Sequence, residues 1–237
     1  MEEHSPFSDC TLVIMAKAPR LGEVKTRLSA CLPPAAILRL YRCLLSDTIT
    51  LAQSLNGVET AIMSPAPDVE ELSRLAGDGV RVIAQTGDGL GAALTAVFAH
   101  FAAAGRRRIV AFNSDSPHLP QSTLLMAFEA LASCDLVAGP THDGGYYLVG
   151  ASTSHPDLFA GSSMGTTSAL DALLEQARSL ALSVRFTEPF YDVDVPADLS
   201  RLAEELRLAP ARAPRTASWL TEWARATAQI RAHGGDA

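Results

Sequence analysis

The chain has 237 residues, of which 48% are hydrophobic and 19% are charged. This length and composition support one sizeable folded core, which excludes a short peptide and a disordered tail. With 19 Lys and Arg against 26 Asp and Glu, the net charge is −7, which disfavours a nucleic-acid-binding surface over the whole protein.

The cysteines and the first residues indicate the compartment. None of the four cysteines forms a C-x-x-C pair, and the acidic start MEEHSPFSDC lacks the basic and apolar regions of a secretory signal. No apolar run approaches the roughly 20 residues that a membrane-spanning helix needs. We therefore expect a cytoplasmic protein with reduced thiols and no membrane contact.

Short β-rich runs alternate with longer segments of helical spacing, the pattern of βαβ units around a mostly parallel sheet. The expected strands are 11–16, 58–64, 80–85, 108–114, 135–140, 144–151 and 182–188. The expected helices are 34–54, 68–76, 91–104, 121–133, 166–181 and 196–206. The strand at 144–151 follows its predecessor too closely for a crossover helix, so we expect it to be antiparallel or to turn away at the sheet edge.

The first helix and the C-terminal segment carry further patterns. One face of the helix at 34–54 collects Ile37, Leu40, Tyr41, Leu44, Leu45 and Thr48. After Ala209 the run APARAPRT indicates a linker, and the following SWLTEWARATAQIRA indicates a helix with Trp219 and Trp223 on one face. We expect residues 1–208 to form one nucleotide-binding domain, and residues 209–237 to be a linker and a helix that packs on the core or on a partner.

A basic loop follows the first strand, and ligands of open α/β sheets bind at the carboxyl ends of the strands. The only two lysines of the chain, Lys17 and Lys25, lie in KAPRLGEVKTRL together with Arg20 and Arg27. Four cations on one loop suit a polyphosphate, because arginine binds phosphate oxygens in pairs and lysine acts as a mobile point charge. The alternative is a solvated basic loop.

A glycine-rich turn follows the third strand. In TGDGLGAAL, Gly87, Gly89 and Gly91 lead into a helix and leave room for a base or ribose against the backbone. The third glycine of the dinucleotide-binding fingerprint is missing. A plain tight turn is the alternative.

Carboxylates follow two other strands. Asp115 lies just past the strand at 108–114, where it suits Mg²⁺ or Mn²⁺ as a hard oxygen ligand or serves as a turn or cap residue. Asp192 and Asp194 point to the same side of an extended segment, so both could approach the same ion. Alternatively, Asp194 caps the helix that Pro196 opens.

The segment GPTHDGGYYLVG places Asp143 next to Gly144, Gly145 and Tyr146. Paired glycines at the start of a strand allow a ligand to approach closely, and the tyrosine hydroxyl could reach a bound group. A polar turn in front of an ordinary strand is the alternative.

Taken in order, four motifs resemble a bacterial family of GT-A-fold transferases that are often labelled glycosyltransferases, some in arsenosugar contexts. The motifs are K-A-P-R-x-G-x-V-K-T-R-L, N-S-D-S-P-x-L, G-P-x-x-D-G-G-Y-Y-L-V-G and D-V-D-x-P-x-D-L. The chain is similar, more distantly, to 2-phospholactate and phosphoenolpyruvate guanylyltransferases. The resemblance covers about residues 11–206 and implies an α/β fold: a single-domain GT-A (nucleotide-diphospho-sugar transferase-like) three-layer sandwich with a mostly parallel mixed sheet.

The resemblance also implies roles. Four cations would contact nucleotide phosphates: Lys17, Arg20, Lys25 and Arg27. Residues 89–91 would lie near the base, and Asp115 and Asp194 would hold the metal. Relatives carry a Trp-Ser-Thr element near 163–167, where this chain has Ser-Met-Gly-Thr-Thr, so their acceptor preference is not carried over.

These observations favour a transferase that moves a nucleoside monophosphate from a nucleoside triphosphate to a small phosphorylated or hydroxylated acceptor, with Mg²⁺ or Mn²⁺. Residues expected to be catalytic are Lys25, Arg20 and Asp115. Residues expected to bind the nucleotide are Lys17, Arg27, Gly87, Gly89 and Gly91. Residues expected to bind the acceptor are Asp143, Gly144, Gly145 and Tyr146, and those expected to bind metal are Asp115, Asp192 and Asp194.

Two alternatives remain open. One is a glycosyltransferase that uses a nucleotide-sugar at the same metal site, and the other is a nucleotide-binding module without turnover. We expect small-molecule partners, no nucleic acid and no membrane, and a monomer or homodimer.

Overall fold

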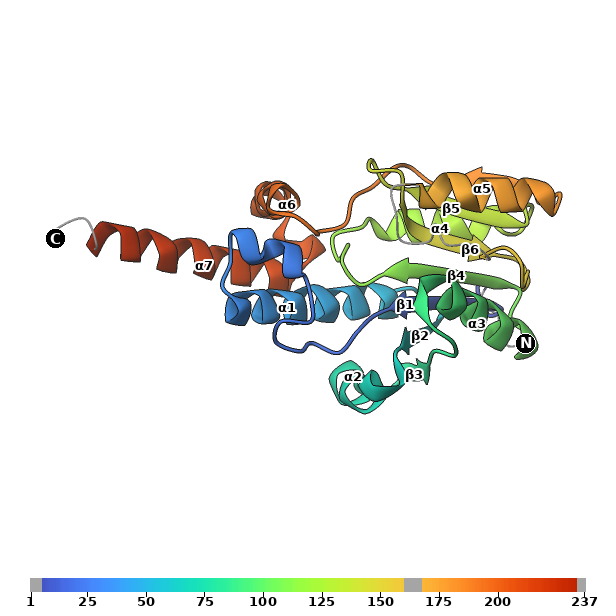
Figure 1. Ribbon diagram of the computed structural model, residues 1–237, viewed down its shortest axis with the longest axis horizontal. Coiled ribbons are helices and arrows are strands. Elements are labelled where there is room, and N and C mark those ends of the chain that lie inside the picture. Colours follow the sequence, from blue (N-terminus) through green and yellow to red (C-terminus); the bar gives the residue numbers. More distant parts are fainter. Residues whose placement is uncertain (1–5, 160–167, 234–237) are drawn as a thin grey trace.

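The computed structural model describes residues 6–159 and 168–233 (Figure 1). Within these ranges seven strands form one sheet in the order β3-β2-β1-β4-β6-β5-β7. The strands are β1 (Cys10–Met15), β2 (Glu59–Ser64), β3 (Arg81–Ala84), β4 (Arg108–Asn113), β5 (Leu136–Pro140), β6 (Tyr146–Ala151) and β7 (Val184–Phe186). The segment 163–167, where the resemblance leads us to expect Trp-Ser-Thr, lies outside the described residues.

The sheet is mixed because of one strand. β1 pairs in parallel with β2 and β4, β2 with β3, and β5 with β7, whereas β6 is antiparallel to both β4 and β5. The turn between β5 and β6 is too short for a crossover connection, so the chain must reverse direction. The expected antiparallel strand is confirmed, and the loops after β1, β2, β3, β4, β5 and β7 share one edge.

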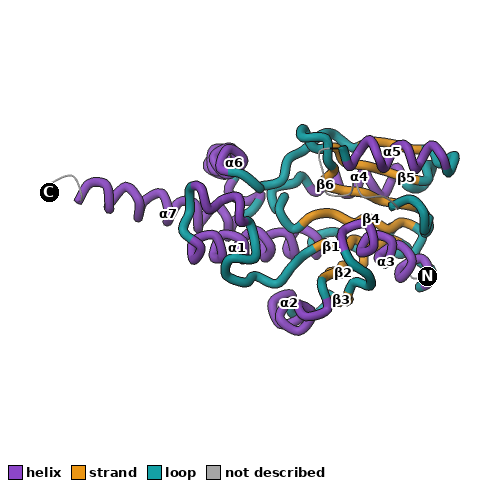
Figure 2. The backbone as a smooth tube through the Cα atoms, in the orientation of Figure 1, coloured by secondary structure: helices purple, strands orange, loops and turns teal. Residues whose placement is uncertain are grey.

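Helices cover both faces of the sheet (Figure 2). They are α1 (Pro34–Gln53), α2 (Val69–Ala76), α3 (Gly89–Ala103), α4 (Gln121–Ala130), α5 (Ala169–Ser179), α6 (Pro196–Leu208) and α7 (Pro214–His233). Successive side chains of β1 point to opposite faces of the sheet, and each face is covered by different helices. Leu12 and Ile14 pack in a core with α1 and α4, and Val13 packs in a core with α3 and α5. The predicted α/β three-layer sandwich with a mostly parallel mixed sheet is confirmed. No helix in the described ranges combines the length and apolarity needed to cross a membrane.

The segment after residue 208, which we expected to be a linker, is largely helical in the structure. A short 3₁₀ helix, η3 (Pro210–Arg212), precedes α7, which already begins at Pro214. The carboxylate of Asp47, on α1, accepts hydrogen bonds from the Thr216 backbone N–H and hydroxyl, both at 2.8 Å, and pairs with Arg215 at 3.2 Å. The buried Asp47 thus accepts hydrogen bonds from N–H groups at the start of α7 that have no partner within the helix. The composition of residues 209–216 alone does not indicate this contact.

The C-terminal helix packs on α1 at its beginning and then extends away from the sheet (Figure 1). Trp219 is buried and its ring stacks on Trp223, with centroids 5.6 Å apart and planes 5° from parallel. A core cluster around Leu28, Leu40 and Leu202 receives Trp219. The segment thus joins α1 and α6 beside the sheet.

We predict that Asp47→Ala lowers the free energy of unfolding by about 2 kcal/mol, because it leaves buried Thr216 donors without an acceptor. Both tryptophans of the chain lie on α7, so their fluorescence in urea reports on this contact. Asp78→Ala, in an exposed turn, is the control and should change stability by less than about 0.5 kcal/mol. Equal effects of the two substitutions would contradict the role of Asp47.

Candidate active site

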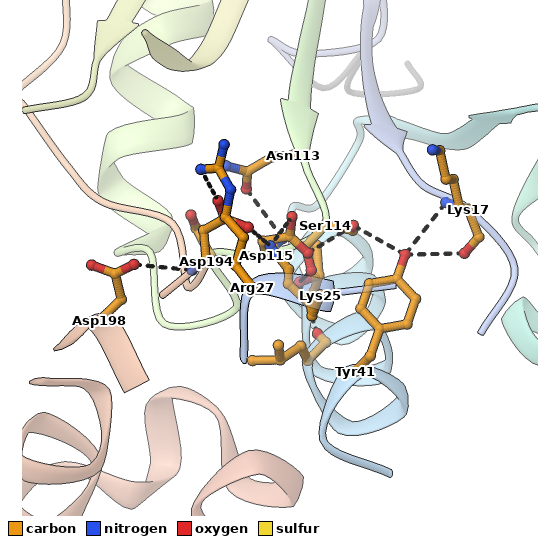
Figure 3. A network of polar contacts seen from close by, with 12 residues as sticks. Lys17, Lys25, Arg27, Tyr41, Asn113, Ser114, Asp115, Asp194 and Asp198 are labelled. Atoms are coloured by element: carbon orange, nitrogen blue, oxygen red, sulfur yellow. Dashed lines mark hydrogen bonds and ion pairs between the residues drawn. The ribbon is translucent and has the colours of Figure 1, made fainter. Parts of the chain in front are cut away.

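A buried ammonium lies between two carboxylates at the shared edge of the sheet (Figure 3). The Nζ of Lys25 is 2.6 Å from Oδ2 of Asp115 and 3.6 Å from Oδ1 of Asp194. The guanidinium of Arg27 binds the other oxygen of Asp194 at 2.8 Å. Residues 25–27, 115 and 194 come from three separate segments, so the fold brings the predicted cations and carboxylates together.

The backbone directs the lysine inward. Lys25 has φ 48° and ψ 40°, a left-handed conformation, and it precedes the 3₁₀ helix η1 (Thr26–Ala30). This conformation is uncommon for a residue with a Cβ and costs free energy, so surrounding contacts must hold it. The Lys25 side chain is 7% exposed, whereas that of Arg27 is 72% exposed. Lys25 is therefore the interior cation of the pair.

The electrostatics of the cluster follow from burial and charge. Burial alone would lower the pKa of Lys25, but the carboxylate of Asp115, with smaller contributions from Asp194 and Asp192, raises it above its ordinary value. Burial raises the pKa of Asp192, opposed by Lys25 and reinforced by the charge of Asp115. Lys25 therefore remains protonated at neutral pH and balances charge that the carboxylates create.

Backbone contacts fix the position of Asp115. Its N–H donates to Oδ1 of Asn113 at 3.2 Å, and the hydroxyl of Ser114 donates to its Oδ1 at 3.2 Å. Its carbonyl accepts from the N–H of Val193 at 3.1 Å. The buried hydroxyl of the next residue, Ser116, donates to the carbonyl of Tyr191 at 3.0 Å. These bonds tie the loop after β4 to the segment that carries Asp192 and Asp194.

The alternative that Asp194 caps α6 is wrong. Asp198, in the first turn of α6, accepts hydrogen bonds from the backbone N–H groups of Asp194 and Val195 at 3.0 and 2.8 Å. The carboxylate of Asp194 instead faces Lys25 and Arg27 (Figure 3). Asp198 thus meets the capping requirement, which leaves Asp194 available to the site.

Arg20 and Lys17 lie on the same loop but outside this cluster. The guanidinium of Arg20 pairs with the buried Asp68, donates to the carbonyl of Pro67 at 3.0 Å, and lies 3.6 Å from Glu71. Lys17 lies two residues past the end of β1, with an exposed side chain. Arg20 thus fastens the loop to the turn before α2, and the predicted phosphate contacts of both cations stay predictions.

The glycine turn after β3 has the backbone that its sequence indicates. Gly87 and Gly89 have φ of 76° and 84°, a region that favours glycine. The helix α3 begins at Gly89, two residues earlier than expected, so Gly91 is already helical. β3 is two strands from β1 in the sheet, so this turn flanks the cluster at the same edge. Its contact with a base stays a prediction.

The predicted acceptor residues form a tight turn between β5 and β6. The carboxylate of Asp143 accepts from the hydroxyl of Thr141 and from the N–H of Gly145. The Thr141 hydrogen bond is the main reason why the pKa of Asp143 is lowered, and the charge of Arg27 contributes. Gly144 has φ 88°, and Tyr146 packs partly buried against the core. Asp143 therefore stabilises the turn itself, and acceptor binding stays a prediction.

The side chains at the site determine whether the predicted metal ion could bind there. Among the described residues no group of three or more His, Cys, Asp or Glu side chains is arranged to hold a metal ion. Asp115 and Asp194 nevertheless lie close enough to share the ammonium of Lys25. Mg²⁺ commonly binds proteins through one or two carboxylates together with substrate phosphates. The residues present therefore fit an ion that arrives with a polyphosphate, rather than one held in a complete protein cage.

A family model described as "Uncharacterized protein conserved in bacteria (DUF2064)" matches residues 48–166, half of the chain. The matched part includes Asp115 and the turn at Asp143, but neither the basic loop nor Asp194.

Solved structures match over more of the chain. A crystal structure of a candidate nucleotide-diphospho-sugar transferase from Desulfovibrio desulfuricans G20 has 28% identity and a TM-score of 0.85, covering 91% of this chain and 95% of that chain. A 4-diphosphocytidyl-2C-methyl-D-erythritol synthase from Anaerococcus prevotii DSM 20548 has 9% identity and a TM-score of 0.56, with coverages of 84% and 96%. A CMP:2-keto-3-deoxy-manno-octonic acid synthetase in complex with CTP has 14% identity and a TM-score of 0.55, with coverages of 84% and 99%.

These comparisons confirm the resemblance to GT-A-like transferases and the predicted enzyme class, a transferase. The second and third structures support the fold alone, because their identities are low. Nucleotidyl and glycosyl transfer remain as two branches of the same class.

Sequence reasoning missed the residues that support the cluster. The sequence places Tyr41 only on an apolar helix face, yet its hydroxyl contacts Ser114 and the backbone of Lys17. Asp68 and Asp198 were placed only in a helix or a helical turn. A tyrosine in an apolar stripe is the one sequence signal, because its hydroxyl needs a partner when the ring is buried.

We predict that Lys25→Met lowers the free energy of unfolding by about 1–3 kcal/mol, because it leaves the carboxylate of Asp115 without its cation, whereas Asp194 keeps Arg27. Mg²⁺ should raise the melting temperature of this variant more than that of the unaltered protein, since the competing ammonium is gone. Thermal unfolding with and without Mg²⁺ measures both effects. Lys17→Met, at the only other lysine, is the control, and a Mg²⁺ effect of the same size in all three proteins would contradict a shared cation position.

Proposed function

The chain belongs to the bacterial DUF2064 family, and we propose that it is a metal-dependent nucleotidyltransferase. It would move a nucleoside monophosphate from a nucleoside triphosphate to a small phosphorylated or hydroxylated acceptor. The observation that supports this most is the Lys25 ammonium between Asp115 and Asp194.

The cluster is suited to an exchange of partners. The carboxylates of Asp115 and Asp194 are neutralised by Lys25 and Arg27. A nucleotide accompanied by a divalent ion carries both charges: the ion suits the carboxylates, and the phosphates suit the two cations. The carboxylates would then pair with the divalent ion instead of Lys25 and Arg27, and these two cations would pair with the phosphates. No charged group is left buried without a partner of opposite charge. A free metal ion or a free polyphosphate offers only half of this exchange.

The residues have distinct tasks in this reaction. Lys25 and Arg27 bind and orient phosphate oxygens, and their charges stabilise the negative charge that grows on the leaving pyrophosphate. An acceptor oxygen forms a bond to the α-phosphorus while the bond from that phosphorus to the bridging oxygen breaks, and pyrophosphate leaves with the electron pair. Asp115 and Asp194 would hold the metal, which when bound neutralises phosphate charge. An acceptor that is already an anionic phosphate needs no general base.

A glycosyltransferase with a nucleotide-sugar donor is the second candidate, favoured by the description of the Desulfovibrio structure as a candidate nucleotide-diphospho-sugar transferase. Such an enzyme would use the same carboxylates but release a nucleoside diphosphate. We favour nucleotidyl transfer because Lys17, on the same loop as Lys25 and Arg27, has an exposed side chain and offers a third cation to a longer phosphate chain. A non-catalytic nucleotide-binding module is the third candidate, and it predicts binding without either product.

We predict that the protein with Mg²⁺ releases pyrophosphate from at least one of the four common nucleoside triphosphates when phosphorylated or hydroxylated small acceptors are supplied. A coupled pyrophosphate assay measures this product, and a parallel assay measures nucleoside diphosphate from nucleotide-sugars. Asp115→Asn is the control and should abolish either activity. Diphosphate release without pyrophosphate from any triphosphate would favour the glycosyltransferase and contradict our proposal.

We further predict that Lys25→Ala lowers kcat by about 100-fold as well as raising KM for the triphosphate, because its charge acts on the developing pyrophosphate. The effect on KM should shrink as salt rises, since part of it is screened attraction. Arg20→Ala distinguishes two roles: loss of kcat means contact with phosphates, and a change in KM alone means that Arg20 only fastens the loop to Asp68. Arg74→Ala, an exposed arginine beside Glu70, is the control.

If Lys25→Ala changed KM alone, the ammonium would bind the ground state and the transition state equally well. That outcome would contradict its assigned role at the leaving group.

A further inference from the structure

The carboxylate of Asp68 binds the basic loop at two points. Asp68 ends the 3₁₀ helix η2 (Ala66–Asp68), which follows β2, and its side chain is 6% exposed. Its Oδ2 accepts a hydrogen bond from the backbone N–H of Ala18 at 2.9 Å, and its Oδ1 accepts one from the guanidinium of Arg20. A single buried carboxylate therefore holds both the backbone and a side chain of the loop after β1.

The place of Asp68 in the chain would suit a different task. Asp68 directly precedes α2 at the N-cap position, where aspartate is favoured because its oxygen accepts from the first backbone N–H groups of a helix. Its side chain makes no such capping hydrogen bond. Both oxygens instead bind residues 50 and 48 positions earlier in the chain. Asp68 thus serves the basic loop rather than its own helix.

Lys17 lies between the points at which the loop is held. The N–H of Ala16 donates to a carbonyl of β2 at 3.1 Å, and that of Ala18 donates to Asp68. From the side of α1, the hydroxyl of Tyr41 accepts from the Lys17 N–H at 3.3 Å and donates to the Lys17 carbonyl at 3.0 Å. The Lys17 side chain is exposed, and its ammonium lies away from the Tyr41 hydroxyl (Figure 3). A fixed backbone therefore carries an accessible cation.

We infer that Asp68 is a positioning residue that fixes Ala18 and Arg20 and so holds Lys17 in place for the phosphates of a nucleotide. This inference rests on the proposed function, because it assumes that a polyphosphate binds at the basic loop. The free-energy cost of ordering a flexible loop weakens binding, so a loop that is already ordered binds its ligand more tightly. Lys25 is held separately by its two carboxylates, so Asp68 acts through Lys17.

Digestion of the native protein with endoproteinase Lys-C, which cuts after lysine, measures the order of the loop. Lys17 and Lys25 are the only lysines of the chain, and mass spectrometry distinguishes the two cuts. In Asp68→Ala the Ala18 N–H loses its acceptor, so the loop opens more often. Cleavage after Lys17 should rise by about 10- to 100-fold relative to cleavage after Lys25.

Asp47→Ala is the matched control, because Asp47 is also a buried carboxylate that binds a distant backbone N–H. It lowers the stability of the whole protein, so cleavage after both lysines should rise together and their ratio should stay unchanged. If Asp68→Ala does not fold, Asp68→Asn carries the test. It removes the charge that holds Arg20 at nearly constant size and should raise the ratio by about 3- to 10-fold.

Calorimetry with Mg²⁺–tripolyphosphate measures the consequence for binding. Asp68→Ala should weaken this binding by about 3- to 10-fold when Lys17 is present. In a protein that already carries Lys17→Ala it should have no further effect, because the cation that it positions is gone.

Four outcomes would overturn the inference: an unchanged cleavage ratio in the Asp68 variant, equal weakening with and without Lys17, no binding at all, and tighter binding because Arg20 is released to the phosphates. The proposed function fails separately. A protein that shows the expected effects of Asp68→Ala but releases no pyrophosphate would retain the positioning role and lose the nucleotidyltransferase. Pyrophosphate release with unchanged tripolyphosphate affinity in Asp68→Ala would give the reverse result.

Discussion

Two carboxylates at one edge of the sheet cannot lie close together without a cation, and most features of the site follow from that constraint. Like charges at short range in a partly buried position raise the free energy of the folded state. Lys25 provides that cation, and its backbone is left-handed. That conformation costs free energy, so the contacts of Lys25 with the two carboxylates must hold it.

The fold imposes the constraint through short connections rather than through the sheet alone. Adjacent β1 and β4 bring the basic loop beside Asp115. The Ser116 hydroxyl and the Val193 amide then join the segment before α6 to the loop after β4. Asp198 caps α6 in place of Asp194, so the helix start is satisfied without using the carboxylate that faces Lys25. Asp198 thus serves the helix start, and Asp194 stays free for the metal binding that we propose.

The sequence predicted the layers of the fold and the residues that meet at the edge, because both depend on patterns within short segments. Alternation along β1 and the apolar stripe of α1 give the layers, and the loops after parallel strands must share an edge. The sequence did not predict contacts with residues far along the chain. Asp47, on α1, accepts a hydrogen bond at the start of α7, inside the expected linker, and Asp68 forms an ion pair with Arg20. Tyr41 was visible only as part of an apolar face. No local pattern indicates which remote group a buried polar atom will contact.

We propose that Lys25 marks the position of a divalent ion and moves to the phosphates when that ion arrives with a nucleotide. A crystal structure with Mg²⁺ and a non-hydrolysable nucleoside triphosphate tests it most directly. We expect the ion bound to oxygens of both Asp115 and Asp194, with the ammonium of Lys25 on phosphate oxygens. An ammonium that stays between the two carboxylates, with the nucleotide bound elsewhere, would contradict the account.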